Sequence, residues 1–148
     1  MTLNIVVACD HRGYEAKRRL VPTISNDGAN TVIDVGCGST EPVDYPDFAL
    51  AAAQKILSGE ATIGILLDNS GIGMSIAANR IKGIRAALAH DVVTARIARA
   101  HNHCNVLCLG VDLLSDEQMK TITQIFLSTE FETGRHARRV AKVEELGL

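Results

Sequence analysis

Gly64-Ile-Leu-Leu-Asp-Asn-Ser-Gly-Ile-Gly-Met-Ser-Ile-Ala-Ala-Asn-Arg80 is the stretch that decides the fold. Its apolar first part predicts a buried strand over 63–67, the two loop glycines allow a tight turn, and the remainder predicts a helix. Free N–H groups at such a helix start attract anions. Asp68 stands where strand becomes loop, where open α/β sheets place their chemistry. In a purely structural interpretation, Asp68 and Ser70 only cap the helix.

Apolar runs alternate with helical periodicity along the whole chain. The expected strands cover 5–9, 31–35, 63–67, 85–89 and 106–109, and the expected helices cover 15–25, 47–57, 74–81, 93–100, 116–127 and 140–146. This alternation predicts an α/β domain over residues 1–148, with a five-stranded parallel sheet covered on both faces and a C-terminal helical tail.

Composition excludes several function classes. The 148 residues are 47% hydrophobic, lack Trp and carry a formal charge of -2, which argues against a nucleic-acid surface. No apolar run reaches the length of a membrane span, and the sequence predicts a cytoplasmic protein. Cys9, Cys37, Cys104 and Cys108 form no CxxC pair, so neither zinc nor disulfides are indicated. Cys37, between two glycines, is either a loop filler or an accessible thiol.

Polar residues gather at the predicted strand ends. Asp10 and His11 follow the first strand, and Asp112 follows the last. His101 ends the helix before the last strand, where a single His is more often a helix-terminal cation than a catalyst. Arg135 and Arg139, four residues apart, would share a helix face and either grip a phosphate or form a solvated basic face.

These residues stand in blocks that resemble the ribose-5-phosphate isomerase B and galactose-6-phosphate isomerase family over the whole chain. The blocks are Cys9-Asp10-His11, Asp44-Tyr45-Pro46, Gly71-Ile-Gly-Met-Ser-Ile-Ala-Ala-Asn79, Gly83-Ile-Arg-Ala-Ala87, His101-Asn102, Asn105-Val-Leu107 and Gly134-Arg-His136. The resemblance implies a three-layer Rossmann-like domain and a cofactor-free, metal-free aldose–ketose isomerase of phosphorylated sugars. It also implies a homodimer, or a dimer of dimers, whose active sites are shared between subunits.

Carried over residue by residue, the resemblance implies that His101 opens the sugar ring with Asp10 as its polar partner. It also implies substrate or phosphate contacts for a larger set: His11, Tyr45, Asn69, Asn102, Arg135 and Arg139. Ser70, in the loop after Asp68, is a further candidate catalytic residue. The backbone amides from Gly71 through Gly73 and Met74 to Ser75 correspond to the loop that steadies an enediolate oxygen. Preorganised N–H donors at a helix start suit that developing negative charge.

Two departures set this chain apart from the family pattern. The usual Cys-Gly-Thr-Gly, whose thiol moves the proton, is here Asp68-Asn-Ser-Gly71, and Met74 stands where some members place Glu. After the last strand, the usual Leu-Gly-x-Arg ends in Asp112 instead of a phosphate-binding arginine. We expect Asp68 to be the base and Asp112 to accept hydrogen bonds from sugar hydroxyls, with a substrate preference shifted away from ribose 5-phosphate.

Other functions stay open at this point. Both departures also resemble the A subunit of galactose-6-phosphate isomerase, which works beside a thiol-bearing B subunit, so the chain is alternatively one half of a heteromer. A catalytically silent sugar-phosphate-binding protein is a further alternative. A dinucleotide-binding module is disfavoured, because the loop lacks the third glycine in register.

Overall fold

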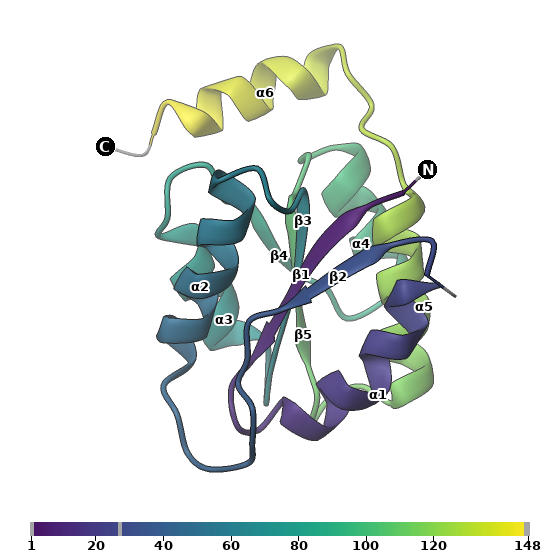
Figure 1. Cartoon of the computed structure of the whole chain (residues 1–148). Helices are drawn as coiled ribbons and strands as arrows, with labels where there is room; N and C mark the ends of the chain where they lie inside the picture. The colour runs from purple at the N-terminus through teal and green to yellow at the C-terminus, as the bar shows by residue number, and fades with distance from the viewer. Residues whose placement is uncertain (1, 27, 147–148) are drawn as a thin grey trace.

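The computed structural model describes residues 2–26 and 28–146, which form five strands and six helices (Figure 1). The strands are β1 (Asn4–Cys9), β2 (Thr31–Asp34), β3 (Ile63–Asp68), β4 (Ala86–Leu88) and β5 (Val106–Gly110). The helices are α1 (Tyr14–Ser25), α2 (Tyr45–Leu57), α3 (Ile72–Asn79), α4 (Val92–Ala100), α5 (Asp116–Ser128) and α6 (Arg135–Glu144). No helix within these residues is both long and apolar enough to cross a membrane.

All five strands are parallel, in the order β2-β1-β3-β5-β4, which confirms the predicted α/β sheet. The strands therefore all end at one edge of the sheet, here called the carboxyl edge, and all begin at the opposite one, the amino edge. The chain first builds outward from β1 to β2 and then continues on the other side of β1 with β3. The ends of β1 and β3 thus form the topological switch point, where such sheets bind ligands.

Helices cover both faces of the sheet, with α2 and α3 on one side and α1, α4 and α5 on the other (Figure 1). Alternating strand residues supply the two cores. Ile65 and Leu67 of β3 pack toward α1, α4 and α5, whereas Leu66 packs toward α2 and α3. β3 is buried along its whole length, which explains why its sequence is a continuous apolar run rather than an alternating one.

The helix α6 differs from the other five. It begins at Arg135, five residues before the predicted 140–146 helix, so that boundary was wrong. The apolar periodicity that suggested the helix exists only in its second half, while its basic first turn follows Gly134, whose φ is +66°. Figure 1 shows α6 lying across the amino edge, with His136 as its only buried residue.

Candidate functional site

Asp68 ends β3 at the switch point, and its carboxylate turns back into its own loop. Oδ1 accepts a hydrogen bond from the Gly71 N–H, and Oδ2 accepts one from the Met74 N–H at 3.2 Å. The side chain is only 3% exposed. Asp68 therefore occupies part of the amide cradle that the sequence predicts for an oxyanion, and the expected helix capping is real.

The protonation of Asp68 is set by two opposing influences. Burial raises the pKa of its carboxyl above the ordinary value, and the neighbouring charge of Asp10 acts in the same direction. The hydrogen bonds from the Gly71 and Met74 amides favour the ionised form and oppose that rise, but burial prevails. A carboxyl with a raised pKa and a nearby second carboxylate suits proton transfer.

Asp10 and His11 follow β1, directly beside Asp68, because β1 and β3 are paired in register up to Cys9 and Leu67. Asp10 is buried, and its Oδ1 accepts hydrogen bonds from the N–H groups of Arg12 and Gly13. The Nδ1 atom of His11 accepts the Val43 N–H at 3.1 Å. A neutral His11 ring then carries its proton on Nε2, which is the arrangement for donating to an anion.

Tyr45 reaches the same loop from the first position of α2. Its ring lies so close to Gly73 that a Cβ atom added there would stand 2.7 Å from it. Gly73 is thus required by this contact, which fixes the phenol against the cradle. The remaining loop residues are arranged around it: Asn69 is exposed, Ser70 Oγ accepts the Ile72 N–H, and Ser75 Oγ donates to the Ile72 carbonyl. The Met74 side chain itself lies in the core.

Asp112 lies at the carboxyl edge after β5, where its Oδ2 accepts a hydrogen bond from Arg12 Nη2 at 2.7 Å. The anion that replaces the expected arginine is thus paired with a cation from the loop after β1. Arg12 was missed from the sequence, because nothing in the spacing of residues 12 and 112 shows that the strand order brings them together. The carboxyl edge therefore keeps a guanidinium even though Asp112 has taken the usual position of one.

The other predicted site residues lie at the amino edge. His101 and Asn102 follow α4 before β5 begins, and α6 carries Arg135 and Arg139. A cavity of about 680 Å³ between α6 and the amino edge is lined by His101, Asn102, His136 and Arg139, with apolar walls that include Val140 and Val143. Arg85 and Glu144 also line this cavity and form an ion pair at 2.6 Å.

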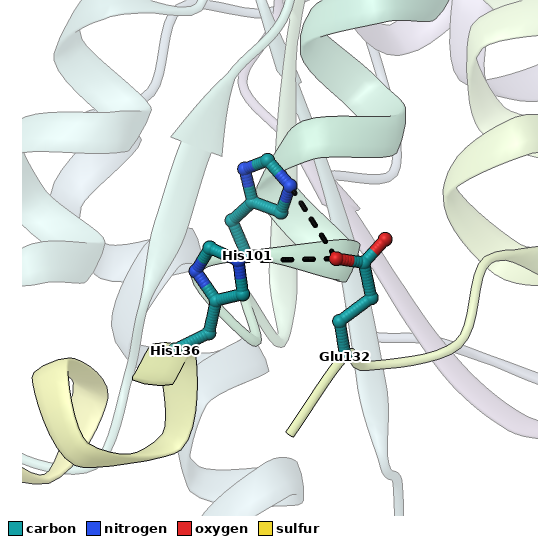
Figure 2. A group of neighbouring side chains, drawn as sticks. All are labelled: His101, Glu132 and His136. Carbon is teal, nitrogen blue, oxygen red and sulfur yellow. Dashed lines mark ion pairs between the residues drawn. The ribbon is translucent and has the colours of Figure 1, made fainter. Parts of the chain in front are cut away.

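His101 has a different neighbour from the one expected. Its ring stacks on that of His136, with centroids 4.2 Å apart, and Glu132 Oε2 lies 3.7 Å from His101 Nε2 and 3.8 Å from His136 Nε2 (Figure 2). Burial lowers the pKa of His136, and the adjacent His101 and Arg135 lower it further. Glu132 and His136 were not predicted as site residues, and only the fold reveals their contact with His101.

The predicted site is therefore divided between opposite edges of one chain. The five steps from Ile63 to Asp68 alone span roughly 17 Å at the usual rise of a strand. Within a single chain His101 therefore cannot contact Asp10. The predicted pair of His101 and Asp10 can form only between two copies of the chain.

Cys37 is not an accessible thiol. It is 3% exposed, its Sγ lies 3.8 Å from that of Cys9, and it donates to the Ser39 carbonyl. The loop around it folds over Cys9, so the filler interpretation is the correct one. Cys9, Cys104 and Cys108 are also buried.

A parallel sheet with two carboxylates and a glycine loop at its switch point defines an α/β fold of the kind that carries ligand sites at the carboxyl ends of its strands. The chain belongs to the ribose/galactose isomerase family, whose model matches residues 5–143. It is 38% identical over 139 residues to ribose-5-phosphate isomerase B of Escherichia coli, covering 94% of this chain and 93% of that protein.

Solved structures show the same relationship. The ribose 5-phosphate isomerase B of Thermotoga maritima superposes with a TM-score of 0.94 at 46% identity, covering 97% of this chain and 99% of that one. That of Mycoplasma genitalium, solved with bound ribulose 5-phosphate, gives 0.90 at 37% identity, covering 96% and 94%. The Rossmann-like architecture and the membership in a family of sugar-phosphate isomerases are thereby established.

Proposed function

We propose that this chain is an aldose–ketose isomerase of a phosphorylated sugar, acting through an enediolate, and that each active site combines the carboxyl edge of one copy with the amino edge of a second. The observation that carries this proposal is the division of the predicted site residues between opposite edges of one chain. Neither half is a complete isomerase site, because the base and loop lie at one edge and the arginines lie at the other.

At the carboxyl edge, Asp68 takes the proton from the carbon next to the substrate carbonyl and returns it to the neighbouring carbon. For this step, one carboxylate oxygen must break its hydrogen bond to the Gly71 or Met74 N–H and rotate toward the substrate. The Gly71 or Met74 N–H released in this way then faces the enediolate oxygen. The loop thus passes its hydrogen bonds from the carboxylate to the substrate as the carboxylate gains the proton.

The amino edge of the second copy supplies the remaining groups. Its His101 transfers a proton at the ring oxygen during ring opening, and its Arg135 and Arg139 hold the phosphate together with His11 of the first copy. Asn102 and Tyr45 contact sugar hydroxyls from the two sides. α6 favours this arrangement, since a ten-residue helix with one buried residue gains little stability within its own chain.

Exposed apolar residues provide surface for such an association. Ile72 and Ile76 of α3 are more than half exposed, as is Val143 of α6. Apolar groups of this kind are often covered by a second copy in symmetric dimers. A dimer of dimers would cover more of them still.

Mixing two inactive variants tests the shared site. Asp68→Asn damages only the carboxyl edge and His101→Asn only the amino edge, so both homodimers are inactive. After unfolding and refolding together in equal amounts, half of the dimers are mixed, and each has one intact site, so about a quarter of wild-type activity returns. No recovery, in a preparation shown to contain mixed dimers, would refute shared sites.

The substrate is proposed to differ from ribose 5-phosphate. Asp68 shortens the reach of the base relative to a longer acid, and the Arg12–Asp112 pair presents a neutralised surface where the family has a free arginine. A panel of tetrose, pentose and hexose phosphates measures the preference. We expect ribose 5-phosphate not to lead the panel, and activity to require the phosphate.

The hydrogen bonds that hold Asp68 in its own loop also favour a second candidate function. A carboxylate that never leaves the cradle would make this chain a silent sugar-phosphate-binding protein, or an A-type subunit that depends on a thiol-bearing partner. Exchange of solvent deuterium into the sugar phosphate separates these alternatives, because exchange by the chain alone requires a working base.

A further inference from the structure

The group formed by His101, Glu132 and His136 has the composition of a metal site. Each side chain offers one ligand atom, and the three atoms lie within 4.8 Å of one another. Figure 2 shows that a nitrogen of each ring faces the same carboxylate oxygen of Glu132. Two imidazoles and one carboxylate, with a fourth position left for water, form a ligand set that zinc adopts in proteins.

The environment of the His136 Nε2 atom indicates that this nitrogen binds a group from outside the chain. The nitrogen is buried and has no hydrogen-bond partner within the described residues. His136 as a whole is 9% exposed, so solvent does not simply take that role. A buried ring nitrogen without a partner is costly, and a bound ion that accepts its lone pair would remove this cost.

The distances suit a small transition-metal ion. For atoms 3.7, 3.8 and up to 4.8 Å apart, the equidistant point lies roughly 2.4 Å from each, only a few tenths of an ångström beyond zinc bonds of about 2.0–2.2 Å. The parallel rings place their lone pairs side by side, so one ring must tilt to converge on the ion. His101 can do this, because its side chain is 40% exposed and histidine χ2 is soft.

The ion would reach the site through the cavity beside α6, which His101 and His136 both line. The four cysteines, which would otherwise compete for a soft metal, are all buried in the two cores. Cys104 also lines this cavity, but it is only 7% exposed, so His101 and Glu132 present the more accessible side chains.

From these observations we infer that His101, Glu132 and His136 bind a divalent transition-metal ion of the zinc class, and that the bound ion inhibits the enzyme by withdrawing His101 from proton transfer. The inhibitory part rests on the proposed function, whereas the binding part does not. A coordinated imidazole nitrogen has its lone pair on the metal and can neither accept nor donate a proton. Zinc would thus act as a reversible inhibitor of the proposed isomerase.

Calorimetric titration of the chelator-stripped protein with zinc chloride tests the binding part. We expect a single class of site with close to one ion per chain, and a loss of affinity of at least about tenfold in Glu132→Gln and in His136→Gln. Glu132 is well exposed, so its variant should fold normally. His90→Gln, which changes an exposed histidine outside the group, should bind zinc like the wild type. Absence of binding, or equal binding by all variants, overturns the inference.

Activity measurements test the inhibitory part on the same preparations. Zinc should suppress wild-type turnover, EDTA should restore it, and Glu132→Gln should stay active at zinc concentrations that silence the wild type. If zinc binds through these residues but no sugar phosphate is isomerised, the proposed function fails and the metal site stands. If the enzyme is active and zinc neither binds nor inhibits, the metal site fails and the proposed function stands.

Discussion

At the carboxyl edge of the sheet, the buried carboxylates are paired within the chain, whereas at the amino edge a buried ring nitrogen of His136 has no hydrogen-bond partner among the described residues. Asp68 and Asp10 accept backbone hydrogen bonds from their own loops, and Asp112 is paired with Arg12. At the amino edge, the His136 Nε2 atom forms no hydrogen bond within residues 2–26 and 28–146, and His136 is the one buried residue of α6. The carboxyl edge is thus stabilised by contacts within the chain, whereas the amino edge carries the groups that we propose contact a second copy and the substrate.

This difference corresponds to two requirements of an isomerase site, which are proton transfer and the binding of a charged substrate. Proton transfer needs a base held in a preorganised, dehydrated loop, which one chain can provide by burying the end of β3. Gripping a charged, mobile substrate needs exposed cations, which α6 presents at the far edge. The contrast predicts that changes in the β3 loop act mainly on kcat, and changes on α6 act mainly on KM. His101 is the exception at the amino edge, because its proposed role is proton transfer and its loss should lower kcat.

The largest effect is expected from Asp68→Asn, which removes the base. Turnover should fall by about 10²- to 10⁴-fold while binding of the sugar phosphate persists. An amide accepts through one oxygen only, so it must also give up one of the two backbone hydrogen bonds, and the loop should loosen slightly. Steady-state kinetics and calorimetric binding of the substrate measure the two effects.

Ser70→Ala is the matched control for that loosening. It removes the hydrogen bond from the Ile72 N–H to Ser70 Oγ and keeps the carboxylate. Its turnover should stay far above that of Asp68→Asn. Near-native turnover in Asp68→Asn would instead remove Asp68 from the mechanism and favour the silent-binding alternative.

Arg12→Ala is expected to have the next largest effect, roughly a 10-fold loss of kcat/KM, because it leaves the Asp112 carboxylate unpaired near an anionic substrate. The double variant Arg12→Ala/Asp112→Ala should recover most of that loss, since it removes the unpaired charge as well. Equal losses in the single and double variants would show that Arg12 contacts the substrate directly rather than through Asp112.

The pH dependence should report the environment of Asp68. Because burial and Asp10 raise its pKa, activity should fall with decreasing pH above the range of an ordinary aspartate, as the base becomes protonated. Asp10→Asn should move this acid limb to lower pH by removing the neighbouring charge. The free energy of unfolding should change with pH in the opposite direction to activity. Because the pKa of Asp68 is raised in the folded protein, this carboxyl stabilises the fold at low pH, and that stabilisation is lost as the pH rises through the raised pKa. An acid limb that stays in place in Asp10→Asn would contradict this assignment.

The sequence predicted the carboxyl edge well because its signals are local. The apolar run of β3, the glycines after it and Asp68 all stand within one stretch, and the β-strand period and turn chemistry define their arrangement. Even there, the return of the Asp68 carboxylate to the Gly71 amide was only one of two interpretations. The structure shows that the carboxylate does return to the loop amides, whereas the role of Asp68 as a base stays a prediction.

The amino edge was less predictable because its contacts join distant segments. His101 and Glu132 are separated by β5 and α5, and only the position of the chain after α5 brings the carboxylate to the ring. The start of α6 was misplaced for a related reason: its first turn, Arg135 to Arg138, has no large apolar residue to mark a core-facing side. Patterns of hydrophobicity predict what packs against the chain itself, and they say little about a helix that lies outside the core.

The smallest effect is expected from Glu144→Gln, which tests whether the ion pair of Glu144 with Arg85 holds α6 in place. Arg85 and Glu144 form a partly buried ion pair at 2.6 Å that joins the end of α6 to the segment before β4. Glu144→Gln keeps the shape and one hydrogen bond, so the free energy of unfolding should fall by no more than about 1 kcal/mol. Because α6 carries Arg135 and Arg139, a looser helix should raise KM a few-fold and leave kcat unchanged. Lys142→Gln, an exposed change on the same helix, is the control and should alter neither constant. A fall in kcat with unchanged KM in Glu144→Gln would mean that α6 contributes to proton transfer, and the division of roles between the β3 loop and α6 would then be wrong.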